Sequence, residues 1–105
     1  MPKRSKKYEE SLLESLQDPV EAAAYLNAHL EDEEDNEEVF LLALRDVAKA
    51  HGFSGIAEKS KLGRESLYKS LSEAGNPKLT TLRTILDSIG LKFNIEPKKK
   101  KKTGT

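Results

Sequence analysis

The chain of 105 residues contains no cysteine and no long apolar run, and both absences restrict what it can be. Without cysteine it has neither disulfides nor thiolate chemistry, which is compatible with a reducing cytoplasm. The longest apolar run spans a few residues, far short of the roughly 20 that a membrane-spanning helix needs. Residues 1–8 are basic but lack the apolar stretch of a secretory signal. We therefore expect a soluble, cytoplasmic protein without membrane contacts.

Histidine is also scarce, which leaves little material for a catalytic or metal site. His29 and His51 are the two histidines, and neither is spaced with acidic residues as metal ligands are. His51 is better explained at a helix C-terminus, where the helix dipole favours a positive charge. The glycines form neither a phosphate-binding loop nor a dinucleotide fingerprint. The sequence therefore predicts no catalytic residue, no metal, no cofactor and no enzyme activity.

The chain contains 18 basic and 18 acidic residues, but the two signs of charge lie in different segments. Residues 9–48 contain thirteen acids and one base, whereas residues 49–95 contain eight bases and four acids. Residues 1–8 and 98–102 add nine further bases. A basic second half suits contact with DNA phosphates, and an acidic first half suits a basic partner. The charge distribution thus predicts two separate binding surfaces.

Residues 54–82 have an apolar spacing that fits two short helices joined by a three-residue turn and followed by a supporting helix. The seam between the helices would consist of Ile56, Ala57, Leu62, Leu67 and Leu71. The outer side of the second helix would present Arg64, Glu65, Ser66, Tyr68 and Lys69. Side chains of these types can bond to base edges and phosphates, as in DNA-reading helices.

This stretch resembles the helix-turn-helix of the phage-repressor-like (Xre) family, and within it the addiction-module antidote proteins often called HigA-like. The resemblance is carried by GRESLYKSLS at 63–72, EAGNP at 73–77 and the Leu/Ile helix at 82–91. It covers residues 18–95. The chain departs from the family pattern at the turn, where Lys61 replaces the usual glycine and Gly63 replaces a small capping residue.

Pattern and resemblance together predict an all-α fold, a compact five-helix bundle of the phage-repressor-like helix-turn-helix type with a short C-terminal β-strand. We expect a disordered basic arm at 1–7, one helical domain at 8–97 with the motif at 54–72, and a disordered Lys-rich tail at 98–105. The strand is expected at 91–95, where apolar and polar residues alternate with a period of two. A lone strand cannot satisfy its backbone groups, so it should pair with a second subunit or with a partner's sheet.

Local signals define several helices within the domain. Asp18 and Pro19 predict a helix start, with an end near Glu31. A further helix should run from a cap at Asn36 to His51 and stop at Gly52. The residues expected to be buried are Ala22, Ala23, Leu26 and Leu30, then Phe40, Ala43, Leu44, Val47 and Ala48, and, on a last helix at 79–89, Leu79, Leu82, Leu86 and Ile89.

Eight residues are predicted to contact DNA: Ser54, Arg64, Glu65, Ser66, Tyr68, Lys69, Asn76 and Lys78. The guanidinium of Arg64, at the start of the recognition helix, can bind O6 and N7 of guanine together, although a solvated arginine is the simpler alternative. Glu65 either accepts from cytosine N4 or orients Arg64. Tyr68 either contacts DNA or packs against the preceding helix, and Ser54 either contacts a phosphate or caps a helix.

Two charged segments leave alternatives open. The acidic run at 31–38, EDEEDNEE, is either a solvated loop or a docking site for a basic partner. The lysine tail either adds nonspecific DNA affinity or only keeps the chain soluble. For the antidote family the basic partner would be a small RNA-cleaving toxin of the RelE type.

The resemblance therefore implies an antitoxin and transcriptional autoregulator of a toxin–antitoxin module. It would bind palindromic operator DNA as a homodimer and neutralise a RelE-type ribonuclease toxin. The alternatives are an Xre-family DNA-binding repressor without a toxin partner, and a protein-interaction module whose motif has lost DNA affinity.

Overall fold

Helices account for all the regular secondary structure in residues 5–31, 37–72 and 75–98, the part of the chain that this computed structural model describes. The helices are α1 (Lys6–Ser15), α2 (Pro19–Glu31), α3 (Glu37–His51), α4 (Phe53–Ser60), α5 (Arg64–Ser70) and α6 (Leu79–Ser88). The all-α class is confirmed. Two details of the prediction are wrong, because these ranges hold six helices instead of five and no β-strand.

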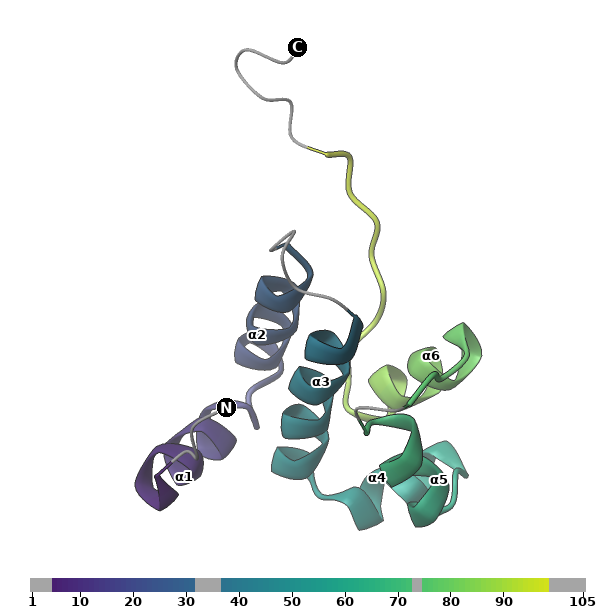
Figure 1. Ribbon diagram of the computed structural model, residues 1–105, viewed down its shortest axis with the longest axis horizontal. Helices are drawn as coiled ribbons and strands as arrows, with labels where there is room; N and C mark the ends of the chain where they lie inside the picture. The colour runs from purple at the N-terminus through teal and green to yellow at the C-terminus, as the bar shows by residue number, and fades with distance from the viewer. Residues whose placement is uncertain (1–4, 32–36, 73–74, 99–105) are drawn as a thin grey trace.

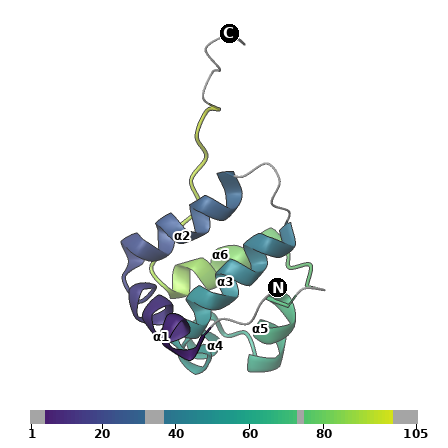
Figure 2. The same ribbon diagram turned by 60° about the vertical axis from the view of Figure 1, so that its left-hand side comes forward.

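Helix α3 stands in the middle of the molecule in Figure 1, with α1 and α2 on one side and α4, α5 and α6 on the other. In the view of Figure 2, α3 lies between α2 and α5. It packs directly against α1, α2 and α4. The five residues predicted to be buried on it, Phe40, Ala43, Leu44, Val47 and Ala48, are all buried, together with Leu41. Gly52 ends the helix as expected, with a φ of 92° that residues other than glycine rarely adopt.

Helix α1 includes Lys6 and Lys7, two residues that we expected in a disordered basic arm. The reason is a cap, because the Ser5 hydroxyl accepts a hydrogen bond from the Tyr8 amide at 3.0 Å. The helix is tied to α3 by an ion pair of 2.7 Å between Glu9 Oε1 and Lys49 Nζ. Residues 1–4 of the expected arm, and 99–105 of the expected tail, lie outside the described residues.

Helix α2 starts as predicted, because Asp18 Oδ1 accepts a hydrogen bond of 3.0 Å from the Val20 amide. Ala22 and Leu26 are buried, whereas Leu30, which we expected in the core, is 59% exposed. Leu30 lies in the last turn of α2, which extends past the first turn of α3 (Figure 1). Helix α3, which covers the apolar face of α2, therefore does not reach Leu30.

Helix α6 packs against α4, and its inward face is shifted from the prediction. Ile85, Leu86 and Ile89 are buried, and Leu82 packs against the core from its edge. Leu79, predicted to face inward, is 64% exposed. It is the first residue of the helix, one turn before the contact with the core begins. Ile85 was omitted from the predicted set although it has the same helical spacing.

Residues 91–98 follow α6 without forming the predicted strand. The Leu91 amide donates a hydrogen bond of 2.8 Å to the Leu86 carbonyl, which anchors the start of the segment. Beyond it Phe93 is 40% exposed and Ile95 96% exposed. The prediction failed within one subunit because no other extended segment in the described residues offers an edge to pair with.

Candidate nucleic-acid interface

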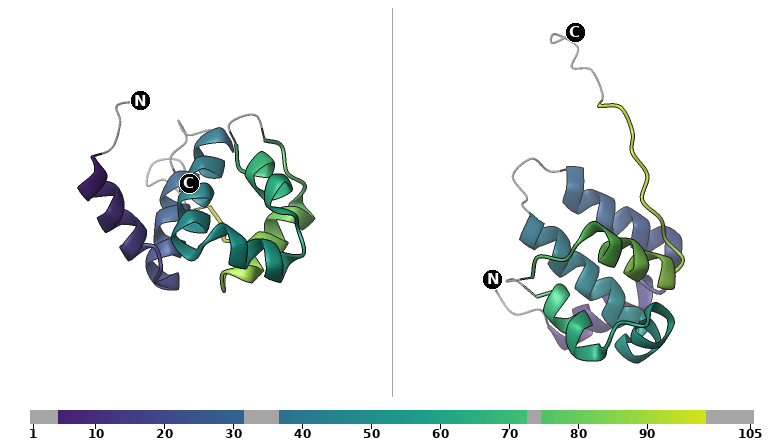
Figure 3. Two further views of the ribbon diagram at one scale, coloured as in Figure 1. Left: turned by 90° about the horizontal axis from the view of Figure 1, so that it is seen from below. Right: turned by 90° about the vertical axis from the view of Figure 1, so that its right-hand side faces the viewer.

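Helices α4 and α5 are joined by the three residues 61–63, as the sequence predicted. Leu67 is the buried residue of α5, with no exposed surface, and it faces the same core as Ile56 of α4. Ala57 and Leu62 are partly buried against this core. The left-hand view of Figure 3 looks onto this end of the molecule. A seven-residue helix is too short to persist alone, so these contacts hold α5 in place.

The outer side of α5 presents a polar face, made of Arg64, Glu65, Ser66 and Lys69. All four side chains are exposed, and none forms a hydrogen bond or ion pair with another described residue. Reading of the major groove requires exposed, unpaired donors and acceptors on one helix face. Such groups give up only bonds to water when they bond to base edges. The structure thus brings together four of the five residues that we placed on this face, and Tyr68 is the fifth.

Tyr68 also lies on α5 but packs sideways onto α4. Its ring stacks on Phe53 with centroids 4.4 Å apart and an angle of 28° between the ring planes. The side chain remains 38% exposed. Tyr68 therefore packs against the preceding helix, as one of the two alternatives predicted, and its contact with DNA stays a prediction. The stack adds a second contact between the two helices beside Leu67.

Ser54 does not cap α4, contrary to expectation. The helix begins at Phe53, and Gly52 occupies the cap position without a side-chain hydrogen bond. The positive φ of Gly52 turns the chain sharply enough for α4 to start with only this residue between it and the end of α3. Ser54 is therefore an exposed residue in the first turn of α4, where its hydroxyl faces solvent.

Asn76 and Lys78 precede α6 and are both exposed. Lys78 is the cap residue of α6, in extended conformation and with no side-chain cap hydrogen bond. The chain reaches them by passing close to the end of α5, where a Cβ on Gly75 would lie 2.8 Å from the Lys69 carbonyl oxygen. A glycine is needed at this close approach. The residues before α6 are thus held near the C-terminal end of α5.

Two cations that we did not assign to the interface adjoin it. Lys59 in the last turn of α4 and Lys61 in the turn are both exposed, and they come just before Arg64 in the chain. Their charge and their position next to the recognition helix were visible in the sequence. With Lys69 and Lys78 they give this end of the molecule a basic character that suits phosphates.

Lys61 adopts the left-handed conformation, with φ 63° and ψ 14°. A residue with a Cβ is strained there by about 1–2 kcal/mol, whereas glycine is not. We expect Lys61→Gly to stabilise the protein by about 0.5–1 kcal/mol, since part of the gain is offset by the greater freedom of glycine in the unfolded chain. Thermal denaturation should show a melting temperature raised by a few degrees.

Lys61→Ala is the matched control, because it removes the same charge but keeps a Cβ. It should leave the melting temperature close to that of the parent. An equal gain from alanine would mean that the lysine side chain, and not the backbone conformation, is the unfavourable feature.

Within the described ranges, no three His, Asp or Glu side chains come together as a metal site would require. None of the helices in those ranges is long and apolar enough to cross a membrane.

Comparison with known proteins gives two matches. Residues 6–97 match a family described as "Probable addiction module antidote protein". A relative from Haemophilus influenzae (strain ATCC 51907 / DSM 11121 / KW20 / Rd), described as an uncharacterized protein, is 40% identical over 83 residues. This alignment covers 79% of the chain and 84% of the relative. No solved structure matches the chain.

Proposed function

Because the chain belongs to the family of probable addiction module antidote proteins, we propose that it is the antitoxin of a two-gene module and represses its own operator. In this proposal it carries out two tasks in the cytoplasm. Helix α5 reads operator DNA, and the acidic half of the chain binds and neutralises a basic toxin. The observation that carries the proposal is the exposed and unpaired polar face of α5.

The proposed DNA binding depends on how α5 packs against the rest of the protein. Leu67 fixes the inner side of the helix in the core, so that Arg64 and Lys69 project from a rigid support. Arg64 stands in the first turn, the end that enters deepest into the major groove in helix-turn-helix proteins. In our proposal Arg64, Glu65 and Lys69 contact bases, while Ser66 and Lys78 contact phosphates. Ser54 and Asn76 lie on neighbouring elements and would add backbone contacts.

One copy of α5 covers too few base pairs to select an operator. We propose a homodimer that places two copies of α5 in successive major grooves, about 34 Å apart on a palindromic site. The strong acidity of residues 9–48 argues that this half faces away from the DNA, because it would be repelled by phosphates.

The toxin-binding part rests on charge and on family membership. Exposed acids such as Glu10, Glu14 and Glu21 lie on α1 and α2, away from α5 (Figure 1). Residues 32–36 of the acidic run lie outside the described residues. The proposed toxin is a RelE-type ribonuclease, whose RNA-binding surface must be basic and therefore complements this half.

A pull-down combined with a mobility shift tests both tasks. The full chain is used to capture the product of the neighbouring reading frame, and its binding to the upstream DNA is measured separately. We expect both interactions. DNA binding without a captured toxin would instead support a plain repressor, and capture without a DNA shift would overturn the role of α5.

Capture of the toxin should depend on salt through its association rate. Raising the ionic strength from about 0.05 M to 0.5 M shortens the Debye length from roughly 14 Å to 4 Å and weakens the attraction between the acidic half and a basic toxin. We expect the association rate to fall at least tenfold and the dissociation rate to change much less. Stopped-flow or surface-based kinetics measure both rates, and an association rate that ignores salt would contradict charge steering.

A further inference from the structure

Residues 91–97 leave the helical body as an extended segment whose apolar side chains are only partly covered. Beyond the Leu91 amide, no backbone group of residues 92–98 forms a backbone hydrogen bond with another described residue. Leu91 packs against the core, whereas Phe93 and Ile95 stand progressively further out. An extended segment with free backbone groups and alternating apolar residues is suited to strand addition.

We propose that residues 91–97 pair antiparallel with the same residues of a second copy of this chain, about a two-fold axis at Asn94. The pairing would create the homodimer that the proposed function requires, and in that respect it rests on that function. Three features of the segment support this occupant and this register.

The first feature is the match of side chains across the pair. Pairing about Asn94 places Lys92 opposite Glu96, twice by symmetry, and Phe93 opposite Ile95, also twice. Opposite charges and apolar pairs in directly facing positions stabilise a two-stranded ribbon. The segment is thus complementary to itself in charge.

Neighbouring registers lose this match. A shift of the axis by half a residue pairs odd positions with even ones and mixes polar with apolar side chains on each face. An axis at Phe93 places Lys92 opposite Asn94, and an axis at Ile95 places Glu96 opposite Asn94. The axis at Asn94 alone pairs the lysine with the glutamate.

The second feature is the direction of the backbone groups. In an antiparallel pair, alternate residues turn both the N–H and the C=O toward the partner. If Lys92, Asn94 and Glu96 do so, the N–H positions of Leu91 and Pro97 point away from it. The Leu91 amide is already bonded to Leu86, and Pro97 has no N–H to donate. The two backbone positions that cannot donate to a partner strand are therefore positions from which such a strand would accept no hydrogen bond.

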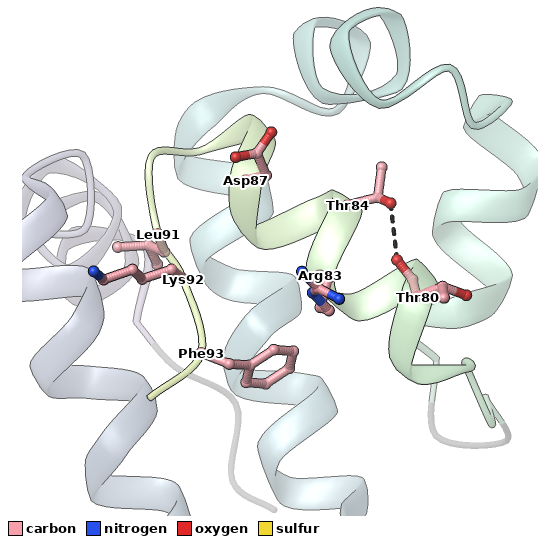
Figure 4. Close-up of a pocket in the computed structure, with 7 residues that line it drawn as sticks. All are labelled: Thr80, Arg83, Thr84, Asp87, Leu91, Lys92 and Phe93. Carbon is pink, nitrogen blue, oxygen red and sulfur yellow. Dashed lines mark hydrogen bonds between the residues drawn. The ribbon is translucent and has the colours of Figure 1, made fainter. Parts of the chain in front are cut away.

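The third feature is the space beside Phe93. A groove of about 670 Å³ separates the segment from α6 and is lined by Thr80, Arg83, Thr84, Asp87, Leu91, Lys92 and Phe93. Figure 4 shows the Phe93 ring projecting from the segment on the side where α6 lies. A smaller hollow of about 140 Å³ on the α2 side is also lined by Phe93, together with Leu26 and Leu30. Ile95 of the second copy, placed opposite Phe93, would cover apolar surface at these hollows.

The location of the segment is compatible with DNA binding. In the right-hand view of Figure 3 the segment rises from the body on the side opposite to α4 and α5. Pairing there leaves the polar face of α5 exposed in both copies. The dimer would thus present two recognition helices.

A charge exchange tests the register in solution. Lys92→Glu and Glu96→Lys each place like charges opposite one another twice, and at low salt each should raise the dimer dissociation constant about 5- to 30-fold. The double variant restores opposite charges and should return the constant to within about threefold of the parent. Sedimentation equilibrium of the full chain measures all four proteins. A double variant as weak as the single ones would overturn the register.

A cross-link tests the axis itself, using the absence of native cysteine. In the proposed pair the two Asn94 Cα atoms are about 5.5 Å apart, within disulfide range. Asn94→Cys should therefore form a covalent dimer rapidly under mild oxidation. Lys92→Cys is the matched control, because its two copies are offset by four residues, about 13 Å along the strands. Equal cross-linking rates for the two variants would contradict the axis.

These tests separate the interface from the proposed function. A parent chain that is monomeric at micromolar concentration, yet captures the toxin and shifts the operator, would overturn the interface and leave the function standing. If the charge variants altered toxin capture while the monomer–dimer equilibrium stayed constant, the segment would instead belong to the toxin interface, and the self-pairing would be wrong.

Discussion

Replacing Arg64 with alanine is expected to weaken specific operator binding by about 1–3 kcal/mol, a factor of roughly 5 to 150 in affinity. Arg64 is exposed in the first turn of α5 and has no partner among the described residues. Its removal therefore costs no hydrogen bond or ion pair within the described residues, and we expect the loss to report on DNA binding. Fluorescence anisotropy with operator DNA, at fixed salt, measures the change.

The control for this variant is Arg45→Ala, which removes an exposed arginine from α3 in the acidic half. It should leave operator affinity nearly unchanged. Binding to unrelated DNA provides a second comparison, because Arg64→Ala should reduce specific binding more than nonspecific binding. If the Arg64→Ala variant bound the operator as tightly as the parent, Arg64 would not be part of the DNA interface. A uniform loss on all sequences would make it a phosphate contact.

The second large effect is expected inside the protein, where Leu67→Ala should destabilise the fold by about 2–5 kcal/mol. Leu67 has no exposed surface and is the buried residue of the seven-residue helix α5. A small domain is stable by roughly 5–15 kcal/mol, so the loss is a large fraction of the total. Denaturant titration followed by circular dichroism should show the change as a shifted midpoint with a similar slope.

Leu79→Ala is the matched control, since it is the same substitution at a leucine that is 64% exposed. We expect it to change stability by less than about 0.5 kcal/mol. If Leu79→Ala destabilised the protein as much as Leu67→Ala, the first turn of α6 would have to be packed in solution. If Leu67→Ala were neutral, α5 could not be held by the core contact described above.

Together the two variants distinguish an effect on operator binding from an effect on the stability of the fold. Arg64→Ala should reduce operator affinity without changing the midpoint of unfolding, because the side chain is exposed and forms no hydrogen bond or ion pair with another described residue. Leu67→Ala should lower stability first and affect operator affinity through the loss of a fixed α5. A single variant showing both effects in full would indicate that the face of α5 also takes part in packing.

Several features follow from short-range chemistry and could be predicted from the sequence. Asp18 caps α2 and Gly52 ends α3, because each acts on backbone groups within a few residues of itself. The buried stripe of α3 follows from the helical period alone. The polar face of α5 follows in the same way, since one helix places all of its residues.

Other features depended on where neighbouring helices begin and end. Leu30 and Leu79 have the spacing of core residues, yet each lies in a terminal turn and remains exposed. Ser54 has the chemistry of a helix cap, but the turn at Gly52 places the cap two residues earlier. The exposed fraction of an apolar side chain depends on whether a neighbouring helix covers it. The residues around it in the sequence do not show where that helix lies.

The amino-acid sequence alone predicts the helical class, the positions of most helix ends and the separation of acidic from basic halves. These depend on local backbone hydrogen bonds and on charge counts, which need no tertiary contact. Helix packing places Tyr68 on Phe53, brings Ile85 into the core and leaves residues 91–97 unpaired with any other described segment. Those outcomes depend on surfaces that meet only after the helices have packed around α3.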